Sequence, residues 1–270
     1  MTAETELVPI QTSGDRAAAS LGDKSRFVKE IEDALLGEEI DLAVHSAKDL
    51  PGELPDGLEI VAVPEAEDPR DALVGAASLE SLPPGARLGT SSLRRRSELL
   101  AARPDLDVAE MRGNVDTRLR KLADGEYQAI VLALAGLRRL GRAGEAGATL
   151  DLHRFVPAPG QGMLAVEARG GDADVAAVAA ALDHAQSHAR LWCERAVVER
   201  LDATCWTPVG ASSTQANGEL KAFAYVGLPD GSEWITDAVA GDASDPAAVG
   251  TLLADRLLSA GAGDLLRRSG

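Results

Sequence analysis

The chain has 270 residues, a formal net charge of −16, 45% hydrophobic residues and only 3% aromatic residues. An acidic chain binds nucleic acid and anionic membranes poorly, and so few aromatic rings argue against stacking on single-stranded bases. Two cysteines, no signal-peptide pattern in residues 1–6 and no run approaching the ~18 apolar residues of a membrane span predict a soluble cytoplasmic protein of one to three domains.

Short apolar runs alternate with helical patterns through the first part of the chain. Runs rich in Val, Ile and Leu predict strands over residues 40–44, 58–63, 87–90, 106–111, 127–134 and 163–166. Helical patterns predict helices over residues 93–102, 115–123 and 135–140. Strands that alternate with helices of this length indicate βαβ units and a mostly parallel sheet, so the predicted fold class is α/β.

The pattern changes towards the C-terminus. Breaker residues at 157–162 indicate a crossing between domains, and helices are predicted over residues 173–181 and 189–201. Three short strands follow at 209–215, 219–226 and 233–239, separated by the hairpin dipeptides Asn217-Gly218 and Asp230-Gly231. With a last helix over residues 246–258, this part predicts a separate α+β module with a three-stranded antiparallel sheet.

Positive charge is concentrated between residues 87 and 142, which hold twelve Lys or Arg against seven Asp or Glu. Three consecutive arginines, Arg94 to Arg96, stand in the first turn of a helix expected to begin near Ser92. They oppose the helix dipole at a cost of ~0.3–1 kcal/mol each when exposed, so an anion bound at the helix N-terminus would explain them. A solvated arginine-rich face is the alternative, and composition alone does not decide between the two.

Further arginines follow the next predicted strands. Arg112 and Arg118 flank one strand-to-helix turn, and Arg139 follows the strand after it. Each taken alone is best interpreted as a surface residue. Because strand ends converge on one crevice in open α/β sheets, the three together favour a polyanion site.

The segment His45-Ser-Ala-Lys48-Asp49-Leu-Pro51 also follows a predicted strand. Asp49 could act as a general acid, a general base or the counter-charge of a cation, and Lys48 could bind a carboxylate. A turn with a structural salt bridge is an equal alternative. His45 is better interpreted as a structural histidine, and the spacing of the four histidines matches no zinc motif, so no metal site is predicted.

The two cysteines differ in context. Cys193 stands in a helical pattern beside Leu191 and Trp192, which predicts a buried and inert thiol. Cys205 stands in a loop, where a thiol is better placed to act as a nucleophile or an attachment point, although the residues alone make this the less favoured interpretation.

Seven motifs, taken in order, resemble the porphobilinogen deaminase (hydroxymethylbilane synthase) family. They are His45-Ser-Ala-Lys-Asp-Leu-Pro, Glu67-Asp-Pro-Arg-Asp-Ala, Gly89-Thr-Ser-Ser-Leu-Arg-Arg-Arg, Arg112-Gly-Asn-Val-Asp-Thr-Arg-Leu, Ala135-Gly-Leu-Arg-Arg-Leu, Pro159-Gly-Gln-Gly and the loop of Cys205. The resemblance implies two periplasmic-binding-protein-like α/β domains, residues 1–65 with 160–183 and residues 66–159, and a small α+β domain, residues 184–270.

The resemblance also implies an activity. Members of this family are transferases that condense four porphobilinogen molecules head to tail, lose one ammonia at each step and release hydroxymethylbilane by hydrolysis, in tetrapyrrole (haem and porphyrin) biosynthesis. They carry a dipyrromethane cofactor joined by a thioether, here to Cys205. The expected partners are porphobilinogen and the growing polypyrrole chain, with no nucleic acid and no membrane, and the expected state is a monomer.

Site residues are carried over from the matching motifs. The resemblance makes Asp49 the catalytic carboxylate, which stabilises the cation left after ammonia departs. The residues expected to bind the acetate and propionate groups of the cofactor and substrate are Arg94, Arg95, Arg112, Arg118 and Arg139, with Lys24, Ser46, Lys48, Thr90, Ser91, Ser92, Gly113, Asn114 and Gln161 as further contacts.

The sequence departs from the family pattern near its N-terminus. Residues 6–10 match the family's second strand, so we expect the chain to lack the first strand and helix, with their Thr-Arg-x-Ser motif. Around Lys24 the family's glycine-rich lid loop is altered, and Ser20 replaces a second lysine. Three alternatives stay open, namely a two-lobed module that binds a small anion without catalysis, an inactive truncated deaminase, and a thiol hydrolase that uses Cys205 and His45.

Overall fold

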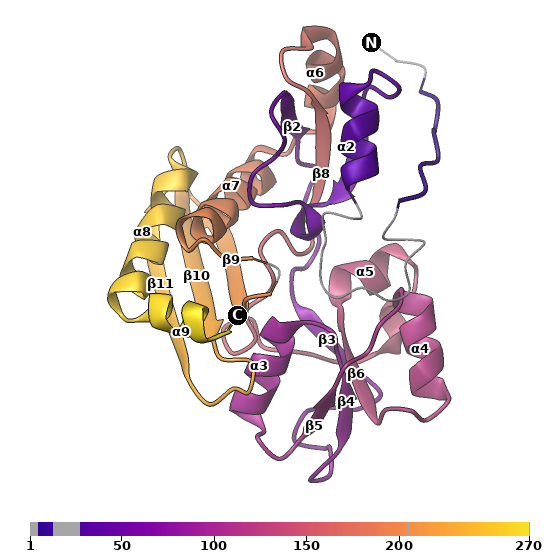
Figure 1. The fold of residues 1–270 in the computed structure, drawn as a ribbon, viewed down its shortest axis with the longest axis vertical. Coiled ribbons are helices and arrows are strands. Elements are labelled where there is room, and N and C mark those ends of the chain that lie inside the picture. Colours follow the sequence, from indigo (N-terminus) through magenta and orange to yellow (C-terminus); the bar gives the residue numbers. More distant parts are fainter. Residues whose placement is uncertain (1–4, 13–27, 205, 270) are drawn as a thin grey trace.

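The computed structural model describes residues 5–12, 28–204 and 206–269, and their strands form three separate sheets (Figure 1). The first sheet contains β1 (Ala43–Ser46), β2 (Leu58–Ala62) and β8 (Leu164–Arg169), in the order β1-β8-β2. Strand β8 follows the strands of the second sheet in sequence, yet it pairs antiparallel with β1 and β2 of the first sheet. Helices α2 (Lys29–Leu36) and α6 (Ala173–Ala179) pack against this sheet.

The second sheet has five strands in the order β5-β4-β6-β3-β7. They are β3 (Asp71–Val74), β4 (Arg87–Gly89), β5 (Asp107–Ala109), β6 (Ala129–Ala133) and β7 (Ala146–Thr149). Buried Leu73, Leu88 and Val131 form part of its core. Helices α3 (Leu93–Ala102), α4 (Val115–Ala123) and α5 (Leu134–Arg139) follow β4, β5 and β6, as predicted, and they place the charged turns on this sheet (Figure 1).

The prediction of a mostly parallel sheet is wrong. Only β4 pairs in parallel, with β5 and β6, and the other pairs among the described strands of the first two sheets are antiparallel. The antiparallel pairs come from β8 in the first sheet and from β3 and β7 in the second. The sequence analysis identified neither β3 nor β7, and β7 (Ala-Gly-Ala-Thr) lacks the apolar run that marks a strand. The α/β class itself is confirmed.

The third sheet is the predicted antiparallel meander. It consists of β9 (Val209–Ala216), β10 (Glu219–Gly227) and β11 (Trp234–Asp242), with β10 in the centre. Asn217 and Gly218 both have positive φ, 52° and 79°, as a two-residue hairpin turn requires. Helices α7 (Ala185–Arg200), α8 (Pro246–Ser259) and α9 (Ala262–Ser269) pack against this sheet and bury residues such as Leu220 and Leu253.

The N-terminal stretch does not form the strand that the family pattern implies. Residues 5–12 have no regular secondary structure, and the side chain of Leu7 is 95% exposed. Pro9 lacks the N–H group that strand pairing requires. The division into three domains stays a prediction, although each sheet falls within one predicted segment. Among the helices described, none has the length and apolarity needed to cross a membrane.

Candidate active site

The Asp49 turn begins where β1 ends. Residues Ala47–Asp49 form a single 3₁₀ turn, and the N–H of Ala47 donates to the Met163 carbonyl at 3.1 Å. Gly160 has a φ of +72°, and a Cβ atom there would lie 3.0 Å from both the Ala47 carbonyl carbon and the Lys48 nitrogen. Glycine is therefore required where residues 157–162, the crossing segment between the first two sheets, pack on the turn. That packing fixes the backbone of Lys48 and half-buried Asp49.

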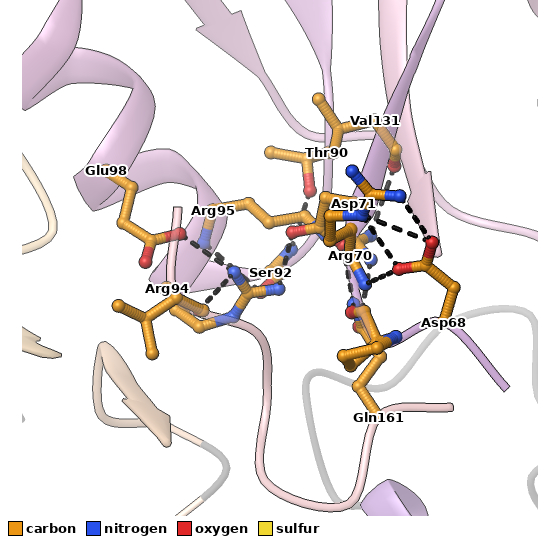
Figure 2. A network of polar contacts seen from close by, with 12 residues as sticks. Asp68, Arg70, Asp71, Thr90, Ser92, Arg94, Arg95, Glu98, Val131 and Gln161 are labelled. Carbon is orange, nitrogen blue, oxygen red and sulfur yellow. Dashed lines mark hydrogen bonds and ion pairs between the residues drawn. The ribbon is translucent and has the colours of Figure 1, made fainter. Parts of the chain in front are cut away.

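A buried carboxylate organises the arginines of α3. Asp71 is only 1% exposed and accepts hydrogen bonds from Arg94 Nη2 at 2.9 Å and Arg95 Nη2 at 2.7 Å. Gln161 Nε2 donates to the same carboxylate at 2.8 Å, and Figure 2 shows these groups converging on Asp71. The network thus joins β3, α3 and the crossing segment through one negative charge.

Electrostatics in this network follow from burial. Burial alone would raise the pKa of Asp71, but the charges of Arg94 and Arg95 outweigh it and hold this pKa well below its usual range. Burial raises the pKa of Glu98 to about 8, although Arg94 lies 2.8 Å away and opposes the shift. Asp71 is consequently the carboxylate that carries the negative charge of the network.

The argument that consecutive arginines require a bound anion needs correction, because the chain supplies its own. Arg94 is 4% exposed, and its two Nη atoms are used by Asp71, Glu98 and the Val156 carbonyl. Arg96 donates to the Val108 carbonyl. Within the described residues, the Nε atoms of Arg94 and Arg95 are buried and have no hydrogen-bond acceptor. Two buried cationic donors therefore remain unsatisfied.

Arg118 bonds to two of the other predicted residues. Its Nε donates to the Gly113 carbonyl at 2.7 Å and its Nη2 to the Ser91 hydroxyl at 3.3 Å. Burial and the charge of Arg95 lower the pKa of Arg118 to about 10, against an opposing effect of Asp49. Arg95 and Asp49 are thus the two charged side chains that influence Arg118. The hydrogen bond to Ser91 joins helix α4, which follows β5, to the turn that follows β4.

Other predicted residues have roles in the fold. The Ser92 side chain caps α3 by accepting from the Arg95 N–H, and the Asn114 side chain caps α4 by accepting from the Thr117 N–H at 2.9 Å. Gly113 has a φ of +119°, which favours glycine. Thr90 is buried and its hydroxyl accepts from the Ser92 N–H.

The remaining predicted arginines lie nearer to solvent. Arg112 pairs with Glu110 at 2.6 Å, and both side chains are substantially exposed. Arg139 donates to the Gly162 carbonyl at 2.7 Å, next to Gln161. Ser46 is exposed at the start of the Asp49 turn. Arg139 therefore borders the crossing segment, while Arg112 is tied to its own loop.

Sequence reasoning missed Asp71 as the centre of the arginine network. Asp71 belongs to the motif of residues 67–72, but its burial depends on strand β3, which the sequence did not reveal. Glu98 was also missed, and its position four residues after Arg94 in the same helix indicates the pair.

The cysteine and histidine predictions can be compared with the structure in part. Cys193 is fully buried, and burial, reinforced by Glu194, raises the pKa of its thiol to about 12, which confirms an inert cysteine. His45 is 6% exposed, with Nε2 2.9 Å from Glu167 Oε2, which confirms a structural histidine and argues against a hydrolase. Cys205 and Lys24 lie outside the described residues.

Comparison with known proteins gives one consistent result. Residues 1–177 match the model described as "Porphobilinogen deaminase, dipyromethane cofactor binding domain", and residues 189–259 match "Porphobilinogen deaminase, C-terminal domain". A porphobilinogen deaminase of Brevibacillus brevis is 45% identical over 98% of this chain and 87% of that protein. One from Desulforudis audaxviator is 48% identical over 96% of this chain and 86% of that protein.

Solved structures give a much weaker likeness. A TRAP periplasmic solute-binding protein from Desulfovibrio salexigens covers 59% of this chain and 59% of its own, with 13% identity and a TM-score of 0.39. A periplasmic substrate-binding protein of an ABC transporter from Coxiella burnetii covers 56% of this chain and 74% of its own, with 15% identity and a TM-score of 0.38. Neither likeness is strong enough to carry an argument.

Proposed function

This chain belongs to the porphobilinogen deaminase family, and we propose that it is a hydroxymethylbilane synthase. As a transferase it condenses four porphobilinogen molecules head to tail, with loss of ammonia at each step, and releases hydroxymethylbilane by hydrolysis. Porphobilinogen carries acetate and propionate groups, so the growing chain is a polycarboxylate. A site for it must offer cations to these groups and a separate carboxylate to the reacting carbon.

The observation that carries this proposal is the neighbourhood of Arg118. A guanidinium that is buried enough to lower its pKa to about 10 lies within electrostatic reach of the Asp49 carboxylate and of a second cation, Arg95. In the described part of the chain its hydrogen-bond acceptors are neutral, a carbonyl and a hydroxyl. A half-buried cation whose hydrogen-bond acceptors are neutral favours an anionic ligand, which supports a polycarboxylate.

The residues present fit a dipyrromethane cofactor with four acidic side groups. Buried Nε donors on Arg94 and Arg95, together with Arg118 and Arg139, supply cations around the Asp49 turn. When bound, the cofactor supplies the terminal pyrrole carbon onto which each new unit is added. The attachment point that we propose is Cys205, because the thiol of Cys193 is fully buried with a pKa of about 12.

Asp49 is the proposed catalytic carboxylate. When the aminomethyl group of porphobilinogen loses ammonia, positive charge develops on the substrate, and an ionised carboxylate beside it stabilises the transition state. The same carboxylate accepts the proton that the new pyrrole–pyrrole link must lose.

The other predicted contacts complete the proposal. Ser91 accepts a hydrogen bond from Arg118, Lys48 precedes Asp49 in its turn, and Gln161 bonds to Asp71. Ser92, Gly113 and Asn114 contribute by fixing the turns that present the arginines. The remaining proposed contacts are Lys24, Ser46, Thr90 and Arg112.

We also propose the predicted three-domain division, a monomer and a cytoplasmic location. A buried, unpaired Cys193 suits a reducing compartment, which supports the cytoplasm. The three sheets each fall within one proposed domain, and this supports the division.

Product formation by the Asp49→Ala variant tests the proposed role of Asp49. Purified wild type should convert porphobilinogen to hydroxymethylbilane, whereas Asp49→Ala should keep the cofactor mass and lose about 10²–10⁴-fold in kcat, the range typical of a lost acid–base group. Asp68→Ala is the matched control, because Asp68 is bonded to Arg70 and has no proposed role in the reaction. Normal product formation by Asp49→Ala would remove Asp49 from the mechanism.

A further inference from the structure

Helix α7 contacts the surroundings of the Asp49 turn through two consecutive residues. Glu194 and Arg195 lie on the helix that packs against β9, within the C-terminal unit of residues 184–270. Each side chain nevertheless bonds to a residue outside this unit. Figure 1 shows α7 between the C-terminal sheet and the β1-β8-β2 sheet. Neither residue belongs to the arginine cluster, and no part of the proposed chemistry uses them.

Glu194 holds the crossing segment. It is 2% exposed, and its Oε2 accepts from the Gly160 N–H at 2.8 Å. Its Oε1 accepts from the Ser213 N–H at 2.8 Å and from the Ser213 hydroxyl at 2.9 Å. One carboxylate therefore bonds Gly160 to β9. Gly160 in turn packs on the backbone of Ala47 and Lys48, immediately before Asp49.

Arg195 holds the other side of the turn. Its Nη2 donates to the Gly52 carbonyl at 2.6 Å, three residues after Asp49. Burial lowers the pKa of Arg195, while Glu199 and Glu167 oppose the shift. The group that donates to Gly52 is therefore a partly desolvated cation. The guanidinium also lies 5.7 Å from the centre of the Trp192 ring, which orients it.

We propose that Glu194 and Arg195 are positioning residues. By bonding to Gly160 and Gly52 they hold the Asp49 turn in place, so that α7 determines the position of the Asp49 carboxylate. This inference rests on the proposed function, in which Asp49 is catalytic. Gly160 also precedes Gln161, which bonds to Asp71, so the same helix is linked to the arginine network. Substrate-binding arginines lie on the second sheet, so loss of the grip on the turn affects the position of Asp49 more than substrate affinity.

Steady-state kinetics of Arg195 variants test the proposal. Arg195→Met keeps most of the side-chain volume but removes the donor to Gly52, and kcat should fall about 100-fold, the loss expected for a misplacement of ~1 Å. KM should change much less than kcat, because the turn carries only the proposed contacts Ser46 and Lys48 while the arginines of the second sheet stay in place. Arg195→Lys restores a donor and should recover about ten-fold of the lost kcat.

The matched control is Arg200→Ala, on the same helix. Arg200 pairs with Asp255 across an exposed surface within the C-terminal unit, and its removal should leave kcat and KM at wild-type values. An unchanged kcat in Arg195→Met would overturn the proposal. So would an equal loss in Arg200→Ala, which would mean that α7 matters only for stability. If Arg195→Met does not fold, Glu194→Gln decides by the same kinetics, because it weakens the bonds to Gly160 and Ser213.

Hydrogen exchange separates failure of this inference from failure of the proposed function, because it needs no turnover. The Leu50 N–H donates to Ala47 within the turn, so peptides covering residues 46–54 should exchange faster in Arg195→Met, while peptides of β10 stay at wild-type rates. If wild type makes no product but Arg195→Met shows this exchange pattern, α7 does hold the Asp49 turn and the proposed function fails. If wild type is active and the pattern is absent, the inference is wrong.

Discussion

Asp71 offers the sharpest test of how the arginines are held, because one buried carboxylate serves two buried cations. The Asp71→Asn substitution keeps the shape of the side chain and removes its charge. Arg94 would keep Glu98 at 2.8 Å, but Arg95 would lose its only carboxylate partner among the described residues. Breaking a buried ion pair from one side costs about 3–5 kcal/mol, since it leaves an uncompensated charge.

We therefore expect Asp71→Asn to lower the free energy of unfolding by about 3–5 kcal/mol in urea denaturation at neutral pH. Asp68→Asn is the matched control, because its two arginine partners, Arg70 and Arg138, have 42% and 41% of their side chains exposed, and we expect a loss of about 0–1 kcal/mol. A change below about 1 kcal/mol in Asp71→Asn would refute the reasoning, because two cations would then be stable without the charge of Asp71.

Acid denaturation gives a second test of the same residue. The pKa of Asp71 in the folded protein lies below its unfolded value of 3.8, so its stabilisation is present above that value and is lost as pH falls below it. The difference in the free energy of unfolding between wild type and Asp71→Asn should therefore shrink as pH falls below about 4, and a difference that stays constant would contradict this sign.

Three further predictions concern single side chains. Arg118→Met should raise the KM for porphobilinogen about ten-fold or more, because it removes a desolvated cation from a carboxylate, and an unchanged KM would exclude Arg118 from binding. Cys193→Ala should keep the full cofactor mass, and loss of that mass would implicate the buried thiol. Glu98 has a folded pKa of about 8 against 4.5 unfolded, so the folded state binds more protons between these values and this contribution to stability falls as pH rises. Glu98→Gln should therefore gain stability relative to wild type between about pH 5 and pH 8 in chemical denaturation, and a constant difference would contradict the shift.

Much of the fold could be predicted because local signals agree with it. The helices predicted over residues 93–102 and 115–123 match α3 and α4, since Ser92 and Asn114 cap them and the apolar runs before them form β4 and β5. The hairpin turn at Asn217-Gly218 follows from backbone conformations that these two residues favour. Strands β3 and β7 could not be predicted, because their pairing is set by neighbours distant in sequence.

The candidate site could be predicted in composition but not in its internal arrangement. Motifs identified Asp49 and the arginines, but no spacing indicates that Asp71 neutralises Arg94 and Arg95 while Arg118 is left with neutral acceptors. That distinction depends on which side chains are buried together, which tertiary packing decides. The contact of Arg195 with Gly52 is likewise invisible in sequence, since it joins α7 to a distant turn.

The intact mass of the purified protein, measured before and after addition of porphobilinogen, tests the central claim most directly. The account predicts that wild type carries an adduct of two pyrrole units, that each addition increases the mass by one further unit, and that Cys205→Ser carries no adduct. An unmodified wild type that still produces hydroxymethylbilane, or an adduct of equal mass on Cys205→Ser, would contradict the claim that this site holds an acidic pyrrole chain tethered to one sulfur.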